Sequence, residues 1–107
     1  LLGDIPLGQG SFDLKRIVEI IRTAKPNLQF SLEVITRDAL KVPCLTKEYW
    51  RSVAEPTGAD LARTLQFVRR NSAKAISVTS LPLIDQVKLE DINIASSLNY
   101  AQRELGL

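Results

Sequence analysis

Histidine and methionine are absent from this chain of 107 residues, and cysteine occurs once, at Cys44. A lone cysteine cannot form an internal disulfide, so the sequence does not predict a secreted disulfide scaffold and favours a reduced, cytoplasmic setting. Because no histidine is present to activate its thiol, Cys44 is a poor candidate for a nucleophile. The lack of methionine and the turn-rich start LLGDIPLGQG together predict a piece of a longer protein.

Long apolar runs and an excess of one charge are also missing. No run approaches the roughly 20 residues that span a bilayer, and the start has neither the basic region nor the long apolar core of a signal peptide. Fourteen lysines and arginines against twelve acidic residues leave a net charge of +2. So small and dispersed an excess predicts no nucleic-acid partner and no membrane surface.

The composition that remains is that of an ordinary globular segment. Hydrophobic residues make up 45% of the chain and charged residues 24%, so residues 1–107 are expected to form a single partial domain around one small core. Apolar side chains at helical spacing predict helices at residues 13–25, 47–54, 59–70 and about 89–105. Pro26 ends the first of these, and residues 71–87 show no sustained period.

A strand is expected at residues 28–34. Apolar and polar residues alternate there, which is the period of a strand with two different faces, and Glu33 lies near its end. The order of helix, strand, loop and helices is typical of a slice of an α/β protein. A single strand buries backbone groups without partners at about 1–3 kcal/mol each, so its neighbours must come from missing sequence or from another copy.

Three segments resemble the sugar phosphate isomerase/epimerase family of xylose-isomerase-like TIM barrels. They are PLGQGSFDLKRIVEII, FSLEVITRDALKVPCLT and SLNYAQRELGL, which together reach over nearly the whole chain. The most specific part is the Gly8-x-Gly10 turn with Asp13, followed about twenty residues later by Ser-Leu-Glu at positions 31–33. The resemblance implies an α/β fold, the carboxy-terminal section of a (β/α)8 TIM barrel, mostly helical as an isolated piece with one strand at about 28–34.

The resemblance also implies a site and a reaction. The family holds a divalent metal with two glutamates, an aspartate and a histidine from different strands, and Glu33 matches the glutamate of the last strand as metal ligand and catalytic residue. The metal, one of Mn, Mg, Zn or Co, would polarise a sugar or sugar phosphate while a carboxylate moves a proton next to the carbonyl. With no histidine in the chain, the ligand set is incomplete, so metal and activity are expected only in a full-length parent.

The residues near Glu33 allow more than one functional interpretation. Arg37 and Lys41 lie just past the expected strand and are candidates for binding an anionic group of the substrate, although loop charges are often only solvated. Glu33 has a plainer interpretation as the ion-pair partner of Arg37. Gly8 and Gly10 favour a tight turn over a phosphate site.

A second hypothesis of a different class is a non-enzymatic, mainly helical interaction domain. In this hypothesis the chain self-associates through its single strand, and the isolated chain has no catalytic activity. Such a chain would pair its strand with the same strand of a second copy and bind partners through its apolar faces.

Overall fold

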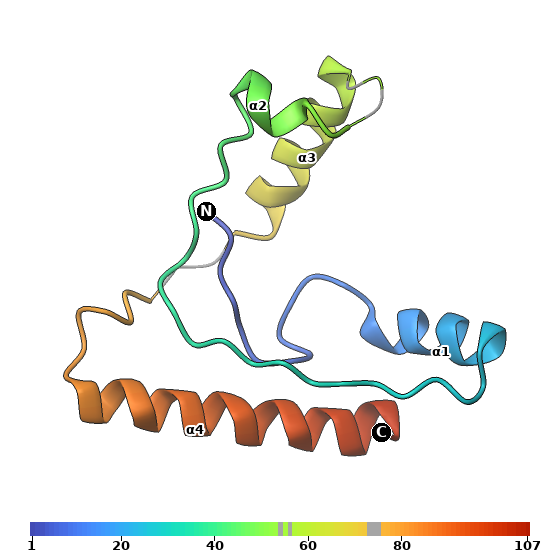
Figure 1. The fold of residues 1–107 in the computed structure, drawn as a ribbon, viewed down its shortest axis with the longest axis vertical. Coiled ribbons are helices and arrows are strands. Elements are labelled where there is room, and N and C mark those ends of the chain that lie inside the picture. The colour runs from blue at the N-terminus through green and yellow to red at the C-terminus, as the bar shows by residue number, and fades with distance from the viewer. Residues whose placement is uncertain (54, 56, 73–75) are drawn as a thin grey trace.

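The computed structural model describes residues 1–53, 55, 57–72 and 76–107, and this part of the chain is helical without a β-sheet (Figure 1). In chain order the helices are α1 (Leu14–Ala24), α2 (Lys47–Trp50), α3 (Gly58–Arg70), α4 (Leu83–Tyr100) and a π-helical turn η1 (Ala101–Leu105) that continues α4. The prediction of a mostly helical chain is therefore correct. The expected helix at 47–54 is shorter than predicted, and its last residue, Ala54, lies outside the described residues.

The expected strand at residues 28–34 does not form, and the prediction of a TIM-barrel section with one strand is wrong for this structure. Within the described ranges, β pairing is limited to one antiparallel bridge, in which Leu2 and Leu40 exchange two N–H···O bonds of 2.8 Å. Residues 28–34 instead form an irregular segment, and its apolar residues are partly exposed. A strand needs a neighbour for its backbone donors and acceptors, and no described segment forms a ladder with residues 28–34.

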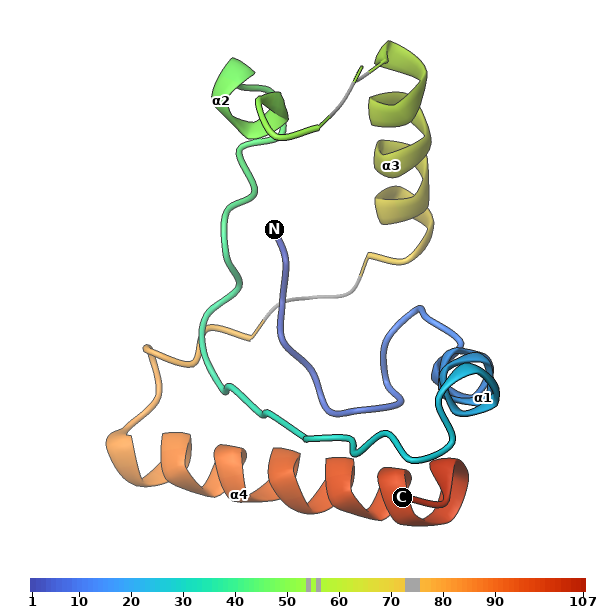
Figure 2. The same ribbon diagram turned by 45° about the vertical axis from the view of Figure 1, so that its right-hand side comes forward.

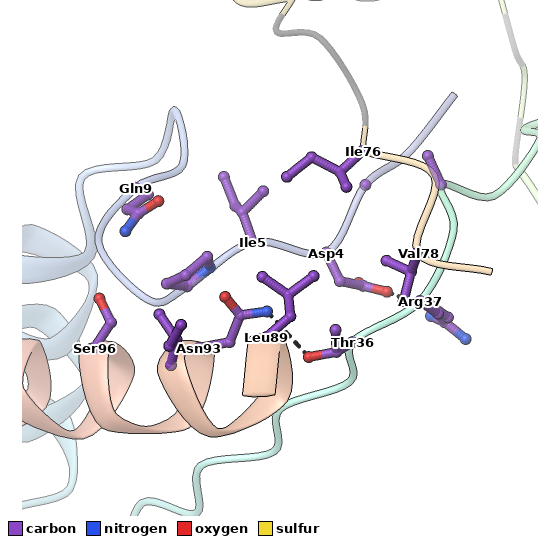
Figure 3. A pocket seen from close by; sticks show the side chains of 14 residues that line it. Asp4, Ile5, Gln9, Thr36, Arg37, Ile76, Val78, Leu89, Asn93 and Ser96 are labelled. Atoms are coloured by element: carbon purple, nitrogen blue, oxygen red, sulfur yellow. Dashed lines mark hydrogen bonds and ion pairs between the residues drawn. The ribbon is translucent and has the colours of Figure 1, made fainter. Parts of the chain in front are cut away.

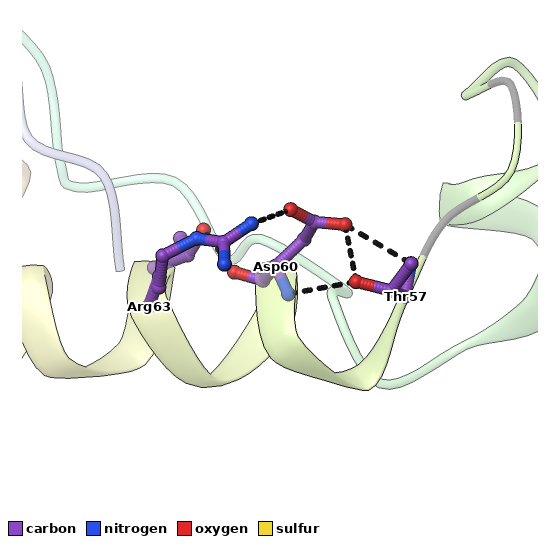
Figure 4. A network of polar contacts seen from close by, with 4 residues as sticks. Thr57, Asp60 and Arg63 are labelled. Carbon is purple, nitrogen blue, oxygen red and sulfur yellow. Dashed lines mark hydrogen bonds and ion pairs between the residues drawn. The ribbon is translucent and has the colours of Figure 1, made fainter.

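Helices α1 and α3 begin at side-chain caps. The carboxylate of Asp13 accepts the Arg16 amide at 3.0 Å at the start of α1, where the sequence placed an acidic residue. At the start of α3, the Thr57 hydroxyl accepts the Asp60 amide at 3.2 Å and the Asp60 carboxylate accepts the Thr57 amide at 3.1 Å (Figure 4). This capping box was missed in the sequence, and it starts α3 at Gly58.

Helix α4 begins at Leu83, well before the predicted start near Leu89. The Pro82 carbonyl accepts the amides of Asp85 at 2.9 Å and Gln86 at 3.1 Å, and the Gln86 side chain donates to the Leu81 carbonyl at 2.8 Å. The first turn was missed although Leu83 and Val87 lie on the same side of the helix as the predicted stripe through Ile94 and Leu98.

The chain ends against α1. Gly106 adopts a left-handed backbone with φ of 63°, which a glycine accepts without strain, and the predicted Gly-Leu stop is confirmed. The Arg22 guanidinium of α1 donates to the carbonyls of Leu105 at 3.1 Å and Gly106 at 2.8 Å. A cation at the carboxyl end of a helix satisfies carbonyls that have no partner within the helix.

The helices are spread apart and do not pack into one compact unit. In both views α4 lies along one edge with the extended segment after α1 beside it, while α2 and α3 lie on the far side of the molecule (Figures 1 and 2). The radius of gyration is 16.7 Å, against about 13 Å for a compact domain of this size. Within the described part, the buried apolar side chains are Val18, Val78, Ala101 and Leu105. The core is therefore small: Val18, Ala101 and Leu105 belong to the contacting elements α1 and η1, and Val78 lies in the wall of a pocket before α4.

Ser97 is the most deeply buried polar residue described, with 1% of its surface exposed. Its hydroxyl accepts the Leu7 amide at 3.0 Å and donates to the Asn93 carbonyl at 2.7 Å. The amino-terminal segment is thereby held on the middle of α4. The next residue, Gly8, has a φ of 86° and lies so close to the Tyr100 ring that a Cβ atom would overlap the ring.

We expect Gly8→Ala to detach this segment. The left-handed backbone costs a non-glycine residue about 1–2 kcal/mol, and the added methyl group must also displace the Tyr100 ring. The Leu7 amide should lose most of its protection from hydrogen exchange. The matched control is Gly58→Ala, where no atom lies within 4 Å of the new methyl group, and it should leave that amide protected. Equal protection of Leu7 in both variants would contradict the close packing of Gly8 on α4.

Candidate functional site

A pocket of about 320 Å³ lies where four segments meet (Figure 3). Its walls come from the amino-terminal segment, the extended segment at 36–39, the residues before α4, and α4 itself. Apolar side chains of Ile5, Ile76 and Leu89 face one another across it, and Asn93 lies on the α4 side. The pocket is therefore mainly apolar with a few polar groups at its edges.

Two polar contacts hold the pocket walls together. The Nε atom of Arg37 donates to Oδ2 of Asp4 at 2.6 Å, and both side chains are partly exposed. The Nδ2 atom of Asn93 donates to the Thr36 hydroxyl at 3.0 Å. An exposed ion pair contributes at most about 1 kcal/mol, so the Arg37 to Asp4 contact orients the segments more than it stabilises them.

The structure brings one of the three predicted site residues to the pocket. Arg37 lies at its rim, and its ion-pair partner is Asp4, so the pairing with Glu33 considered from the sequence does not form. Glu33 is exposed on the extended segment, and neither it nor Lys41 lines the pocket. The three side chains therefore do not converge on one described site.

The metal expected with Glu33 does not fit the described chain. Among the residues described, no group of three or more histidine, cysteine, aspartate or glutamate side chains is arranged to hold a metal ion. A divalent cation needs several oxygen ligands, and one exposed carboxylate does not provide a coordination shell. Glu33 could therefore act as a metal ligand only together with ligands from outside the described residues.

Asp38 makes a contact that the sequence did not reveal. One of its carboxylate oxygens accepts the Thr79 amide at 3.0 Å, and the other accepts the Thr79 hydroxyl. The hydroxyl bond is the largest cause, and the amide bond the next, that hold the pKa of Asp38 below its usual range. These bonds fasten the loop with the buried Val78 to the extended segment, beside the pocket.

Asp4 and Asn93 were also missed as pocket residues. The partners of Asp4 and Asn93 are distant in sequence, so their spacing carries no signal. A weaker signal was present in α4, where Asn93 and Ser97 lie four residues apart on one face of the helix. Polar residues at that spacing on an inner face indicate contacts with crossing chain segments.

No family model matches the chain, and no curated protein or solved structure is significantly similar to it. The resemblance to sugar phosphate isomerases and epimerases therefore stays a prediction. No helix in the described ranges is both long enough and apolar enough to cross a membrane.

The Asp38 contact predicts a local pH dependence. Because the folded pKa of Asp38 is lowered, its stabilisation of the loop is complete above the unfolded value of about 3.9 and is lost as the pH falls through the lower folded value. The Thr79 amide resonance, followed by NMR from about pH 6 to about pH 2, should titrate with a midpoint below about 3.9. Asp38→Asn should abolish this titration. A midpoint at or above the ordinary value would show that the contact does not form.

Proposed function

We propose that this chain is a mainly helical, non-enzymatic interaction module that works by self-association. The observation that carries the proposal is the amount of apolar surface left on its helices. Ile20 on α1, Val68 on α3 and Leu83 on α4 are all exposed, whereas few apolar side chains are buried in the described part. Contiguous exposed apolar surface in a soluble protein marks an interaction site, because burying it removes it from water.

The charges of α3 and α4 favour a second copy of this chain as the partner that covers the exposed apolar surface. Helix α3 carries three arginines and one aspartate, a net charge of +2, whereas α4 carries three acidic residues and one lysine, a net charge of −2. Two copies therefore present surfaces of opposite sign to one another. Closed symmetric pairs of identical chains are also the commonest soluble assemblies.

In this proposal the chain self-associates through apolar helix faces instead of through the strand predicted from the sequence. Residues 28–34 form no strand in the structure, so an edge-to-edge pairing of strands no longer supports association. The apolar helix faces remain, and they need no ladder of backbone hydrogen bonds. A cytoplasmic location, predicted from the single cysteine, is part of this proposal.

The proposal predicts an association that depends on concentration. Sedimentation equilibrium of the native chain should show a monomer that converts to a dimer as its concentration rises. Replacing Leu83 and Ile84 by serine should weaken the dimer at least tenfold, because burying one such side chain contributes about 1.5–3 kcal/mol. Gln102→Ser, an exposed polar change farther along the same helix, is the control and should have no effect. A native chain that stays monomeric at every concentration would refute self-association.

A second candidate is the metal-dependent sugar isomerase or epimerase. The specific observation in its favour is that Glu33 is exposed and makes no ion pair with another described residue, so its carboxylate is accessible to a ligand. In this candidate Glu33 is one metal ligand, Arg37 and Lys41 contact the sugar or sugar phosphate, and the other ligands come from residues outside this sequence. The reaction is proton transfer next to a carbonyl.

For this candidate, Glu33→Gln in a longer protein that contains the chain should lower metal affinity and turnover at least tenfold. The helical content should not change, because the exposed Glu33 side chain makes no ion pair in the described part. Metal content and sugar isomerisation are the two measurements, and Glu48→Gln is the matched control on the exposed surface of α2. Full metal occupancy with native turnover in the Glu33 variant would remove this candidate.

A further inference from the structure

Helix α4 has two distinct faces, and only one of them is used within the chain. The inner face contains Leu89, Asn93 and Ser97, and it packs under the crossing segments. The outer face is formed by five exposed side chains that fall within one sector of about 100° at 3.6 residues per turn. They are Leu83, Ile84, Val87, Ile94 and Leu98. Leu83 and Ile84 are 76% and 61% exposed, whereas Ile94 and Leu98 are partly covered, so the amino-terminal part of this face is open in the described chain.

Helix α3 presents a second apolar face, which is only partly covered. Leu61, Leu65 and Val68 lie on one side of it, and α3 packs against no other described helix. Its contact with the rest of the chain includes Phe67, which stacks on Phe12 with ring centroids 6.1 Å apart. Phe67 lies on a different side of α3 from the apolar face, on which Leu65 and Val68 keep 36% and 45% of their surface exposed.

We propose that α3 of one copy docks on the outer face of α4 of a second copy, and that a two-fold axis repeats this contact in the other direction. The inference rests on the proposed self-association and names the surfaces that carry it. In a parallel register with Leu65 opposite Val87, Leu61 lies opposite Leu83 and Arg69 opposite Asp91, so α3 covers the amino-terminal part of the stripe. Each dimer then contains two helix pairs with apolar side chains interleaved.

Charge selects α3 as the partner over a second α4. Glu90 and Asp91 lie at the two edges of the outer stripe of α4, near its midpoint. In an antiparallel pair of two α4 helices, these four carboxylates would meet at the two-fold axis and repel one another. Helix α3 instead brings Arg69 beside its apolar face, and Arg70, on the far side of the helix, adds to the positive charge of the same turn. Arg69 beside Glu90 and Asp91 converts the repulsion into attraction.

The test reverses the charges on one helix at a time. Variant A carries Arg69→Glu and Arg70→Glu on α3, and variant B carries Glu90→Lys and Asp91→Lys on α4. In a dimer of A with A, or of B with B, both proposed contacts bring like charges together. Each variant alone should therefore dimerise at least tenfold more weakly than the native chain at low salt. An equal mixture of A and B joins opposite charges at both contacts and should recover the native affinity as a heterodimer.

The control reverses two charges elsewhere. Lys47→Glu with Arg51→Glu makes the same change in net charge as variant A, but at α2, and it should leave dimerisation unchanged. Far-ultraviolet circular dichroism of each variant checks that the helices persist. A second measurement does not need the charge variants: in a Cys44→Ser background, chains with Leu65→Cys and chains with Val87→Cys should form a mixed disulfide dimer after air oxidation.

The outcomes separate the two proposals. The pairing of α3 with α4 is wrong if A and B dimerise as tightly as the native chain and no mixed disulfide forms. Self-association still stands in that case if replacing Leu83 and Ile84 by serine weakens the dimer. A native chain that is monomeric at every concentration overturns both. A monomer whose radius of gyration in solution is near 13 Å shows that the chain covers its own helices, and it overturns the second copy as occupant.

Discussion

The buried hydroxyl of Ser97 is the contact on which the rest of the arrangement depends. It accepts the Leu7 amide and donates to the Asn93 carbonyl, and the Asn93 side chain in turn reaches Thr36. Three segments that are remote in sequence are thereby joined on one turn of α4. A buried donor left without a partner costs about 1–3 kcal/mol, so these hydrogen bonds determine where the crossing segments lie more strongly than the sparse apolar contacts do. The pocket exists because the two crossing segments are held apart on the same helix.

The small core leaves much apolar surface available for the proposed self-association. Hydrophobic burial is the main favourable term in folding, and here much apolar surface remains in contact with water. Polar contacts such as the Arg22 bonds to the terminal carbonyls position the helices but add little net stability. In the proposed dimer, a second copy would supply this burial over α3 and α4.

The alternating pattern of the extended segment does not by itself determine its conformation. Between flanking strands, the alternation around Glu33 would direct a carboxylate to one side and apolar groups to the other. Without such neighbours the segment lies along α4, Glu33 is exposed, and Arg37 contacts Asp4 at the pocket rim. The chemistry predicted from the resemblance therefore depends on groups that this chain does not bring together.

Local features of the fold were determined by the sequence because they depend on residues a few positions apart. The cap at Asp13, the end of α1 before Pro26 and the turn at Gly106 follow from backbone geometry and neighbouring amides. The tertiary structure decided which faces are buried and that residues 28–34 form no strand. It also decided that Asp4 meets Arg37, a partner 33 residues away. These outcomes depend on which distant segment supplies the partner for a backbone group or an apolar face, and no local pattern in the sequence contains that information.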